Sequence, residues 1–247
     1  MTELPEKQKI QKSLVVPIIL LGMIWGIKLF EIIFQTDFSD FGILPQTLTG
    51  LRGIIFSPLL HADASHAFAN TLPLFILTTA LYYYYGRLAN RILILSWLIT
   101  GFWVWAFAKN TGYHIGASGI VYALAAFHFT SGLLRREPRM MAFSLLVVFL
   151  YGGLVWGLYP DFYPEKNISW QSHLLGSLAG IILAFFYRQN GPQRKKYSWE
   201  DEEDEDDDGE LPDDENQDPA IDKETTAGSD PTVVYHLRQR QHHEDQF

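Results

Sequence analysis

Long apolar runs separated by short polar segments fill most of the chain. Each run reaches or approaches the roughly 20 apolar residues that a helix needs to cross the hydrocarbon core of a bilayer. There are six such runs, at residues 13–34, 66–85, 92–108, 115–134, 140–159 and 170–187. The first is too long for the apolar part of a secretory signal and lacks a small-residue cleavage site, so we expect a retained helix. The pattern predicts an all-α membrane protein, a bundle of six transmembrane helices.

The composition changes at about residue 198, where the chain becomes acidic, turn-rich and poor in aromatic residues. Of the 28 acidic residues 19 lie within 200–247, against three of the 19 basic ones, so this tail carries −16 and the rest of the chain +7. Such a segment cannot bury enough apolar surface to offset its chain entropy, and disorder is expected. We therefore expect an N-terminus at 1–12, a membrane domain at 13–196 and a disordered acidic tail at 197–247. The sequence does not indicate what binds the tail.

The basic residues predict the orientation of the helices. Cytoplasmic loops carry an excess of Lys and Arg, and one set of loops is rich in them: Lys7, Lys9, Lys12, Arg87, Arg91, Arg135, Arg136, Arg139, Arg188, Arg194, Lys195 and Lys196. The other set holds only Arg52, Lys109 and Lys166. We expect both termini in the cytoplasm and the protein in the plasma (inner) membrane. The basic residues flank apolar runs and form no stripe, which argues against nucleic-acid binding.

Four polar residues interrupt the apolar runs at one depth. His66 and Asn70 begin the second run, Ser118 lies about one turn (roughly 5 Å) into the fourth, and His173 lies equally deep in the sixth. A polar group in hydrocarbon costs several kcal/mol unless it is satisfied, so such residues are usually functional. These four are the candidates for a site near the outer face.

Small residues indicate which of these helices touch. Gly176 and Gly180 share a helix face with His173, and residues 116–119 (Gly-Ala-Ser-Gly) offer a complementary surface. This contact would bring the Ser118 hydroxyl within hydrogen-bonding reach of His173, with Tyr122 beside the ring. A serine next to a histidine is the arrangement for nucleophilic acyl transfer. We expect no buried Asp or Glu to orient the histidine, so the pair would be a dyad.

Three motifs resemble those of the rhomboid intramembrane serine proteases. Gly116, Ala117, Ser118 and Gly119, followed by Tyr122, are similar to that family's nucleophile motif. His173 with Gly176 and Gly180 resembles its base-bearing sixth helix, and His61, His66 and Asn70 resemble its second-helix signature. The resemblance covers roughly residues 13–188 and implies a six-helix rhomboid-like bundle.

The resemblance also implies a role for each residue. Ser118 would be the nucleophile and His173 the general base, and His66, Asn70 and the Ser118 amide would form the oxyanion hole. Tyr122 would stack on His173, and His61 would be structural. The chain would then be a serine endopeptidase without a cofactor, cleaving transmembrane protein substrates that the lipid bilayer delivers laterally, near the outer leaflet. The loop at 36–64 would match the family's membrane-embedded first loop, with Arg52 anchoring it rather than contacting substrate.

Other functions compete with this interpretation. A catalytically silent relative would bind and retain membrane clients, although both members of the dyad are present here. Four histidines toward one side (His61, His66, His114 and His173) could suggest zinc, but the general-base carboxylate of a zinc hydrolase is missing near them. The absence of cysteine excludes a thiol nucleophile and a Cys-ligated metal. A transporter is disfavoured because there is no evident inverted repeat and no intramembrane carboxylate to couple ions.

Overall fold

The computed structural model describes residues 5–109, 112–136, 138–150 and 170–191. All of them belong to the first of the two units into which the chain divides, Met1–Lys196. The acidic tail expected at 197–247, residues 151–159 of the fifth apolar run, and Lys166, Arg194, Lys195 and Lys196 lie outside the described residues. The three-part division of the chain and the disorder of the tail therefore stay predictions.

The described residues are helical apart from loops and one isolated bridge. The long helices are α1 (Glu6–Phe34), α3 (Ala64–Tyr85), α4 (Leu88–Phe107), α5 (Ser118–Leu134), α6 (Pro138–Leu150) and α8 (Trp170–Phe186). Between α1 and α3 lie four short segments: η1 (Ser39–Phe41), η2 (Thr49–Arg52), α2 (Gly53–Phe56) and η3 (Ser57–Leu59). Each of the six apolar runs overlaps one long helix, which agrees with an all-α fold.

The count of six membrane spans is not confirmed. Among the described residues, two helices are long and apolar enough to cross a membrane, Glu6–Phe34 and Leu88–Phe107. Helices α5 and α8 are apolar but have 17 residues each. At 1.5 Å per residue each rises about 25 Å, less than the roughly 30 Å hydrocarbon core of a typical bilayer. The six-helix membrane bundle remains a prediction.

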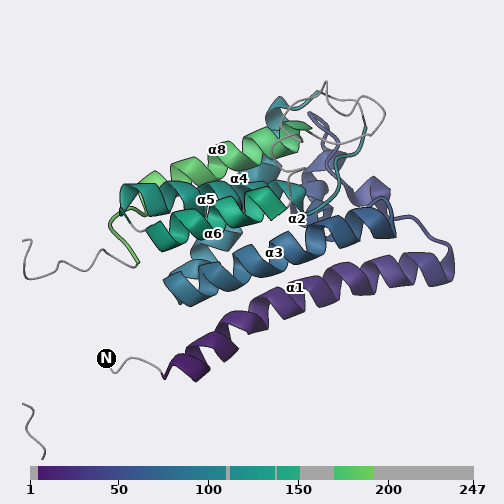
Figure 1. The fold of residues 1–247 in the computed structure, drawn as a ribbon. Helices are drawn as coiled ribbons and strands as arrows, with labels where there is room; N and C mark the ends of the chain where they lie inside the picture. The colour runs from purple at the N-terminus through teal and green to yellow at the C-terminus, as the bar shows by residue number, and fades with distance from the viewer. Residues whose placement is uncertain (1–4, 110–111, 137, 151–169, 192–247) are drawn as a thin grey trace, which may run out of the picture. The chain divides into compact units, whose positions relative to one another are not determined.

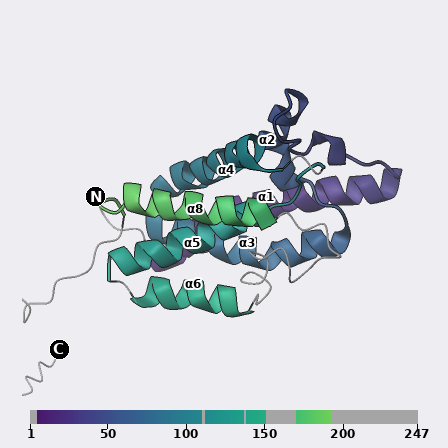
Figure 2. The same cartoon turned by 90° about the horizontal axis from the view of Figure 1, so that it is seen from above.

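Helix α5 lies at the centre of this unit. It contacts α8, α6, α3 and α4, while α1 runs along the outer side of α3 (Figure 1). Figure 2 shows these helices from above, with α5 between α8 and α6. Ile120, Leu124 and Phe127 of α5 are fully buried in the main apolar cluster. The site-bearing helix is therefore held from several sides.

Large apolar side chains cover much of the outside of the unit. Ile33 is 69% exposed, Phe107 69% and Phe186 72%. An exposed apolar surface of this kind is unusual for a soluble monomer and suits a lipid environment. The helices carry apolar residues on both their buried and their exposed faces, which explains why each apolar run is nearly continuous in the sequence.

The loop between α1 and α3 is fastened to α4 and to the segment before α5. The indole nitrogens of Trp97 and Trp105 donate to the carbonyl oxygens of Ile54 and Thr47, at 2.9 and 2.8 Å. The backbones of Ile43 and His114 exchange two hydrogen bonds, of 3.0 and 2.8 Å. The loop is thus a structured platform beside the N-terminus of α5.

Arg52 lies within this platform. Its guanidinium donates to the carbonyl oxygen of Asp40 at 2.9 Å and lies 4.4 Å from the centre of the Phe41 ring. Both partners belong to the same loop, so these contacts are those of the expected loop anchor.

Candidate active site

Two glycines allow α5 and α8 to approach until their backbones touch. A Cβ atom on Gly176 would lie 2.2 Å from the carbonyl oxygen of Gly119, and one on Gly180 would lie 2.0 Å from that of Ala123. Real Cβ atoms essentially never come within 3.0 Å of a non-bonded heavy atom of another segment. Any larger residue at either position would therefore force the two helices apart.

This close approach places Ser118 and His173 side by side. The Nε2 atom of His173 lies 2.9 Å from the Oγ atom of Ser118, within the range of a hydrogen bond. His173 is buried, and its ring stacks on that of Tyr122 with the centroids 4.2 Å apart and the planes inclined by 11°. Tyr122 is one turn beyond Ser118 on α5, so one helix supplies both the hydroxyl that Nε2 approaches and the ring on which the imidazole stacks.

The segment that carries Ser118 is held by the loop before α3. Gly116 has a φ of +114°, a conformation that favours glycine. Its N–H donates to the carbonyl oxygen of Ser57 at 2.9 Å, and the Ala117 N–H donates to Nε2 of His61 at 3.3 Å. These bonds fix the backbone immediately before the nucleophile candidate.

The hydrogen bond from Ala117 requires a neutral His61. The ring of His61 is 2% exposed, and burial, followed by the neighbouring His66, lowers its pKa to about 3. At neutral pH its Nε2 lone pair is therefore available to accept. A buried, neutral ring that accepts a backbone hydrogen bond is in keeping with the structural role that the family resemblance implies for His61.

His66 and Asn70, the oxyanion candidates, lie on the first two turns of α3. A Cβ built on Gly116 would lie 2.7 Å from Cε1 of His66, so this half-buried ring lies against the backbone two residues before Ser118. The buried Asn70 donates from Nδ2 to the carbonyl oxygen of His66 at 2.9 Å. An amide NH₂ carries two hydrogens, so this bond leaves one for another acceptor.

Ser118 is the first residue of α5, with Ala117 as the N-cap. The N–H groups in the first turn of a helix have no acceptor within the helix. The Ser118 amide is one of them, and it points in the general direction of the helix N-terminus. A backbone donor, the N–H of Ser118 itself, is thus available next to the Ser118 hydroxyl.

A small cavity lies on the α4 side of this segment. Its volume is about 20 Å³, enough for about one water molecule. Thr100 and Gly101 of α4, His114, Gly119 and Ser172 are among the residues that line it. The buried Thr100 hydroxyl has no hydrogen-bond partner among the described residues. The cavity adjoins the segment before Ser118 without including Ser118 or His173. Its lining includes two hydroxyl-bearing residues that the sequence pattern did not single out, Thr100 of α4 and Ser172 of α8.

The expectation that no carboxylate is buried in the apolar runs is wrong. Glu31 of α1 is 6% exposed, and its Oε2 lies 2.6 Å from the Nζ of the equally buried Lys28. The sequence did contain a signal for this pair, namely two opposite charges three residues apart near the end of an apolar run. Glu31 bonds to Lys28 and to the Phe38 N–H. These partners leave the description of Ser118 and His173 as a dyad unchanged.

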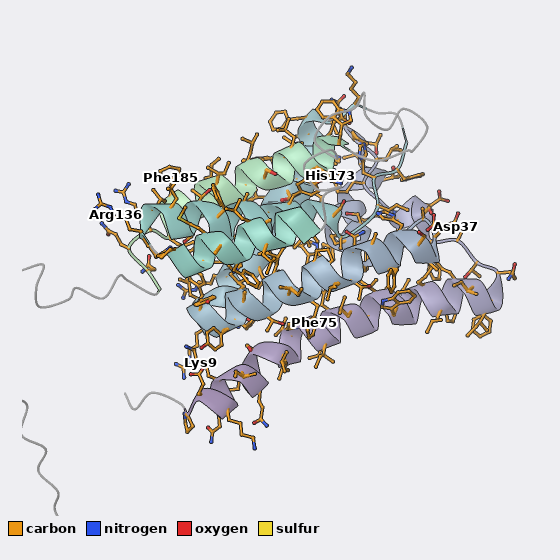
Figure 3. The ribbon with its side chains drawn as sticks, in the orientation of Figure 1. Lys9, Asp37, Phe75, Arg136, His173 and Phe185 are labelled. Carbon is orange, nitrogen blue, oxygen red and sulfur yellow. The ribbon has the colours of Figure 1, made fainter. Side chains whose placement is uncertain are left out.

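The candidate site lies at one end of the helices, and Lys9 and Arg136 lie at the other. In Figure 3 the labelled His173 is at the end of the unit near Asp37, while Lys9 and Arg136 are at the opposite end. Ser118 and His173 lie near the N-terminal ends of α5 and α8. Both residues are therefore at the end of the unit that includes Asp37.

The described unit is that of a helical membrane protein: apolar side chains cover its outside, and a serine and a histidine meet between two of its helices. Comparison with known proteins agrees with this class. The Rhomboid domain family model matches residues 48–190, more than half of the chain. The chain belongs to the rhomboid family, whose members are generally intramembrane serine proteases.

Similar proteins occur in mycobacteria. Uncharacterized proteins of Mycobacterium tuberculosis and Mycobacterium bovis are each 37% identical to the chain over 164 residues, 62% of this chain and 65% of the relative. An uncharacterized protein of Mycobacterium leprae is 30% identical over 189 residues, 71% of this chain and 70% of the relative. The match with the first two thus spans about 65% of their length.

Proposed function

We propose that the protein is an intramembrane serine endopeptidase that uses Ser118 as nucleophile and His173 as general base. One observation carries this proposal: the 2.9 Å contact between Nε2 of His173 and Oγ of Ser118, between two helices in backbone contact. The stacked Tyr122 ring supports it, because a fixed imidazole plane keeps Nε2 directed at the hydroxyl.

The chemistry follows from this geometry. Nε2 takes the proton of the Ser118 hydroxyl as Oγ attacks the carbonyl carbon of the scissile bond, and the resulting imidazolium delivers the proton to the leaving amine. Water then hydrolyses the acyl-enzyme by the same route, with His173 again accepting and returning a proton. No metal or cofactor takes part in these steps.

Donors near Ser118 would stabilise the oxyanion formed in each step. We assign this role to the backbone N–H of Ser118, the remaining amide hydrogen of Asn70, and His66. The close packing of the His66 ring against Gly116 supports the assignment, because it holds the start of α3 beside the nucleophile. Such preorganised donors act on charge that develops only in the transition state.

The substrates would be transmembrane proteins that enter laterally from the lipid bilayer and are cut near the outer leaflet. The position of His173 at the end of the unit opposite Lys9 and Arg136 supports this topology. Because Lys and Arg favour the cytoplasmic side, both termini would be cytoplasmic and the site would face outward. We place the protein in the plasma membrane and treat residues 197–247 as a cytoplasmic appendage.

A catalytically silent binding protein for membrane clients is the alternative. The apolar outer surface would serve either function equally well. The distance between Ser118 and His173 favours the enzyme, since a client-binding protein has no need of a histidine poised on a serine hydroxyl.

The test is hydrolysis of a generic transmembrane substrate by the purified protein in detergent. Ser118→Ala and His173→Ala should each abolish cleavage while the protein remains folded, because the two residues act as a unit. Asn70→Ala and His66→Ala should lower kcat by about 10- to 1000-fold, as expected for one oxyanion donor.

Ser96→Ala is the matched control, since it also removes a serine hydroxyl from an apolar helix. Ser96 is buried in α4, and its hydroxyl has no hydrogen-bond partner among the described residues. It should keep wild-type turnover. Serine-dependent hydrolysis that survives in either dyad variant would refute the assignment, and absence of hydrolysis by the wild type would favour the client-binding alternative.

A further inference from the structure

Helix α1 lies outside the matched Rhomboid domain, yet it carries a buried ion pair close to the candidate site. The Nζ of Lys28 and Oε2 of Glu31 are 2.6 Å apart, and both side chains are less than 10% exposed. Removing two charges from water costs several kcal/mol per ion, and their mutual attraction offsets this only with good geometry and further hydrogen bonds. The further bonds of this pair are therefore informative.

Both members of the pair use their remaining capacity on the loop after α1. Nζ of Lys28 donates to the carbonyl oxygen of Ala62 at 3.3 Å. Oε1 of Glu31 accepts the N–H of Phe38 at 2.8 Å. The pair thus holds both ends of the connection between α1 and α3, one through a carbonyl and the other through an amide.

The Ala62 end of this connection leads directly to the candidate oxyanion hole. Asp63 follows Ala62 and is the N-cap of α3, where its Oδ1 accepts the N–H of His66 at 2.7 Å. Asn70 is one turn further along the same helix. A bond that fixes the Ala62 carbonyl therefore fixes the position at which α3 starts and the depth of its first two turns.

A second contact between the same helices limits their sliding. Nε1 of Trp25, three residues before Lys28, donates to the Oγ1 atom of Thr71 at 2.9 Å. Thr71 is the residue after Asn70. Helix α1 thus contacts the start of α3 both before and after His66 and Asn70, as their side-by-side course in Figure 1 allows.

We propose that Lys28 and Glu31 are positioning residues that fix the start of α3, and with it His66 and Asn70, relative to Ser118. The consequence for catalysis rests on the proposed function, whereas the consequence for the start of α3 does not. The pair touches neither Ser118 nor His173, so it acts through the oxyanion donors and leaves the dyad in place.

The test variant replaces both charges by apolar residues, Lys28→Met with Glu31→Leu. Removal of one partner alone would leave an uncompensated buried charge and destabilise the fold, whereas an apolar pair of similar volume is often tolerated. Lys12→Met is the control, because it removes an exposed lysine from the same helix. Thermal unfolding should give similar midpoints for all three proteins.

The first measurement is hydrogen exchange of the backbone amides of residues 60–70, which needs no activity. Exchange at His66 and Ala67 should rise about tenfold in the double variant, while exchange in α5 and α8 is unchanged. Unchanged exchange at residues 60–70 would overturn the proposal, whatever the enzyme does.

The second measurement is steady-state hydrolysis. The double variant should lose about tenfold in kcat with KM within about twofold, and in an Asn70→Ala background the same change should cost less than about threefold, because residues that act through one another are not additive. Lys28→Arg, which keeps Glu31 and a cation beside it, should have a kcat much closer to that of the wild type than the double variant has.

A wild-type kcat in the folded double variant, or full additivity with Asn70→Ala, would overturn the catalytic part of the proposal. If wild-type protein shows no Ser118-dependent hydrolysis, the proposed function fails and the exchange data alone decide the role of the pair.

Discussion

Replacing Gly176 by alanine should disable the site through a displacement of helix α8. The added Cβ would lie 2.2 Å from the carbonyl oxygen of Gly119, whereas ordinary contacts begin at 3.4 Å. Relief of this overlap requires the helices to separate by about 1.2 Å if the whole shift occurs along that contact. The obstacle is backbone, so a change of rotamer cannot relieve it.

Such a shift acts directly on the dyad. His173 is one turn before Gly176, so most of the displacement would reach Nε2 and lengthen its 2.9 Å contact with Ser118 to nearly 4 Å. A misplacement of about 1 Å can cost 10²-fold in rate, or about 2.7 kcal/mol in the barrier. Overpacking should also lower the free energy of unfolding by about 1–3 kcal/mol.

The assay compares kcat and the thermal midpoint of Gly176→Ala with those of Gly26→Ala. A Cβ on Gly26 of α1 would meet nothing within 4 Å, and alanine is the better helix former by about 1 kcal/mol. The control should therefore keep its kcat and be at least as stable. A folded Gly176→Ala protein with wild-type kcat would refute the reasoning, because it would mean that the backbone contact does not set the distance between Ser118 and His173.

Three further predictions concern other parts of the protein. Burial lowers the pKa of His61 to about 3 in the folded protein, so below about pH 6.5 the unfolded chain binds a proton at His61 that the folded protein does not bind. Wild-type stability should therefore fall as the pH decreases from about 6.5, by up to about 1.4 kcal/mol per pH unit for this group. His61→Gln should lack the part of this loss that His61 contributes, and thermal midpoints between pH 8 and 5 that run parallel for the two proteins would contradict it. Arg135 is buried and donates to the carbonyl oxygens of Tyr187, at 2.7 Å, and of Asn190. Arg135→Met should therefore lower the free energy of unfolding by about 1–3 kcal/mol, and an unchanged thermal midpoint would show that these carbonyls find other donors. Truncation after Lys196 should leave kcat within about threefold, since the Debye length at physiological salt is about 8 Å and screens the charge of the tail, and a tenfold loss with normal insertion would show that the tail regulates the site.

Local patterns were enough to predict the helices and the family. Within the described residues each apolar run overlaps a helix, because a run of apolar residues is a property of neighbouring positions. The motif around Ser118 and the glycines after His173 identified the rhomboid family, which the match over residues 48–190 confirms. The number of membrane spans stays a prediction, because among the described residues two helices are long and apolar enough to cross a membrane.

The sequence also indicated which side chains could meet, but the contact itself depends on packing. Small residues on two helices permit an approach, and only the tertiary structure sets the 2.9 Å between His173 and Ser118 and the stacking on Tyr122. The same holds for His61, whose bond to Ala117 joins residues 56 positions apart. Contacts of this separation follow from how helices pack, and no periodicity along the chain encodes them.

Lys28 and Glu31 mark the limit of the sequence pattern most clearly. In the sequence they are two charges within an apolar run, three residues apart, and such a pair is as compatible with a solvated helix end as with a buried one. Their burial and their bonds to Ala62 and Phe38 exist because the loop after α1 folds back over them. The sequence determined the charges and their spacing; only the tertiary structure, by removing water from around them and supplying backbone partners from another segment, decided that they are a buried pair.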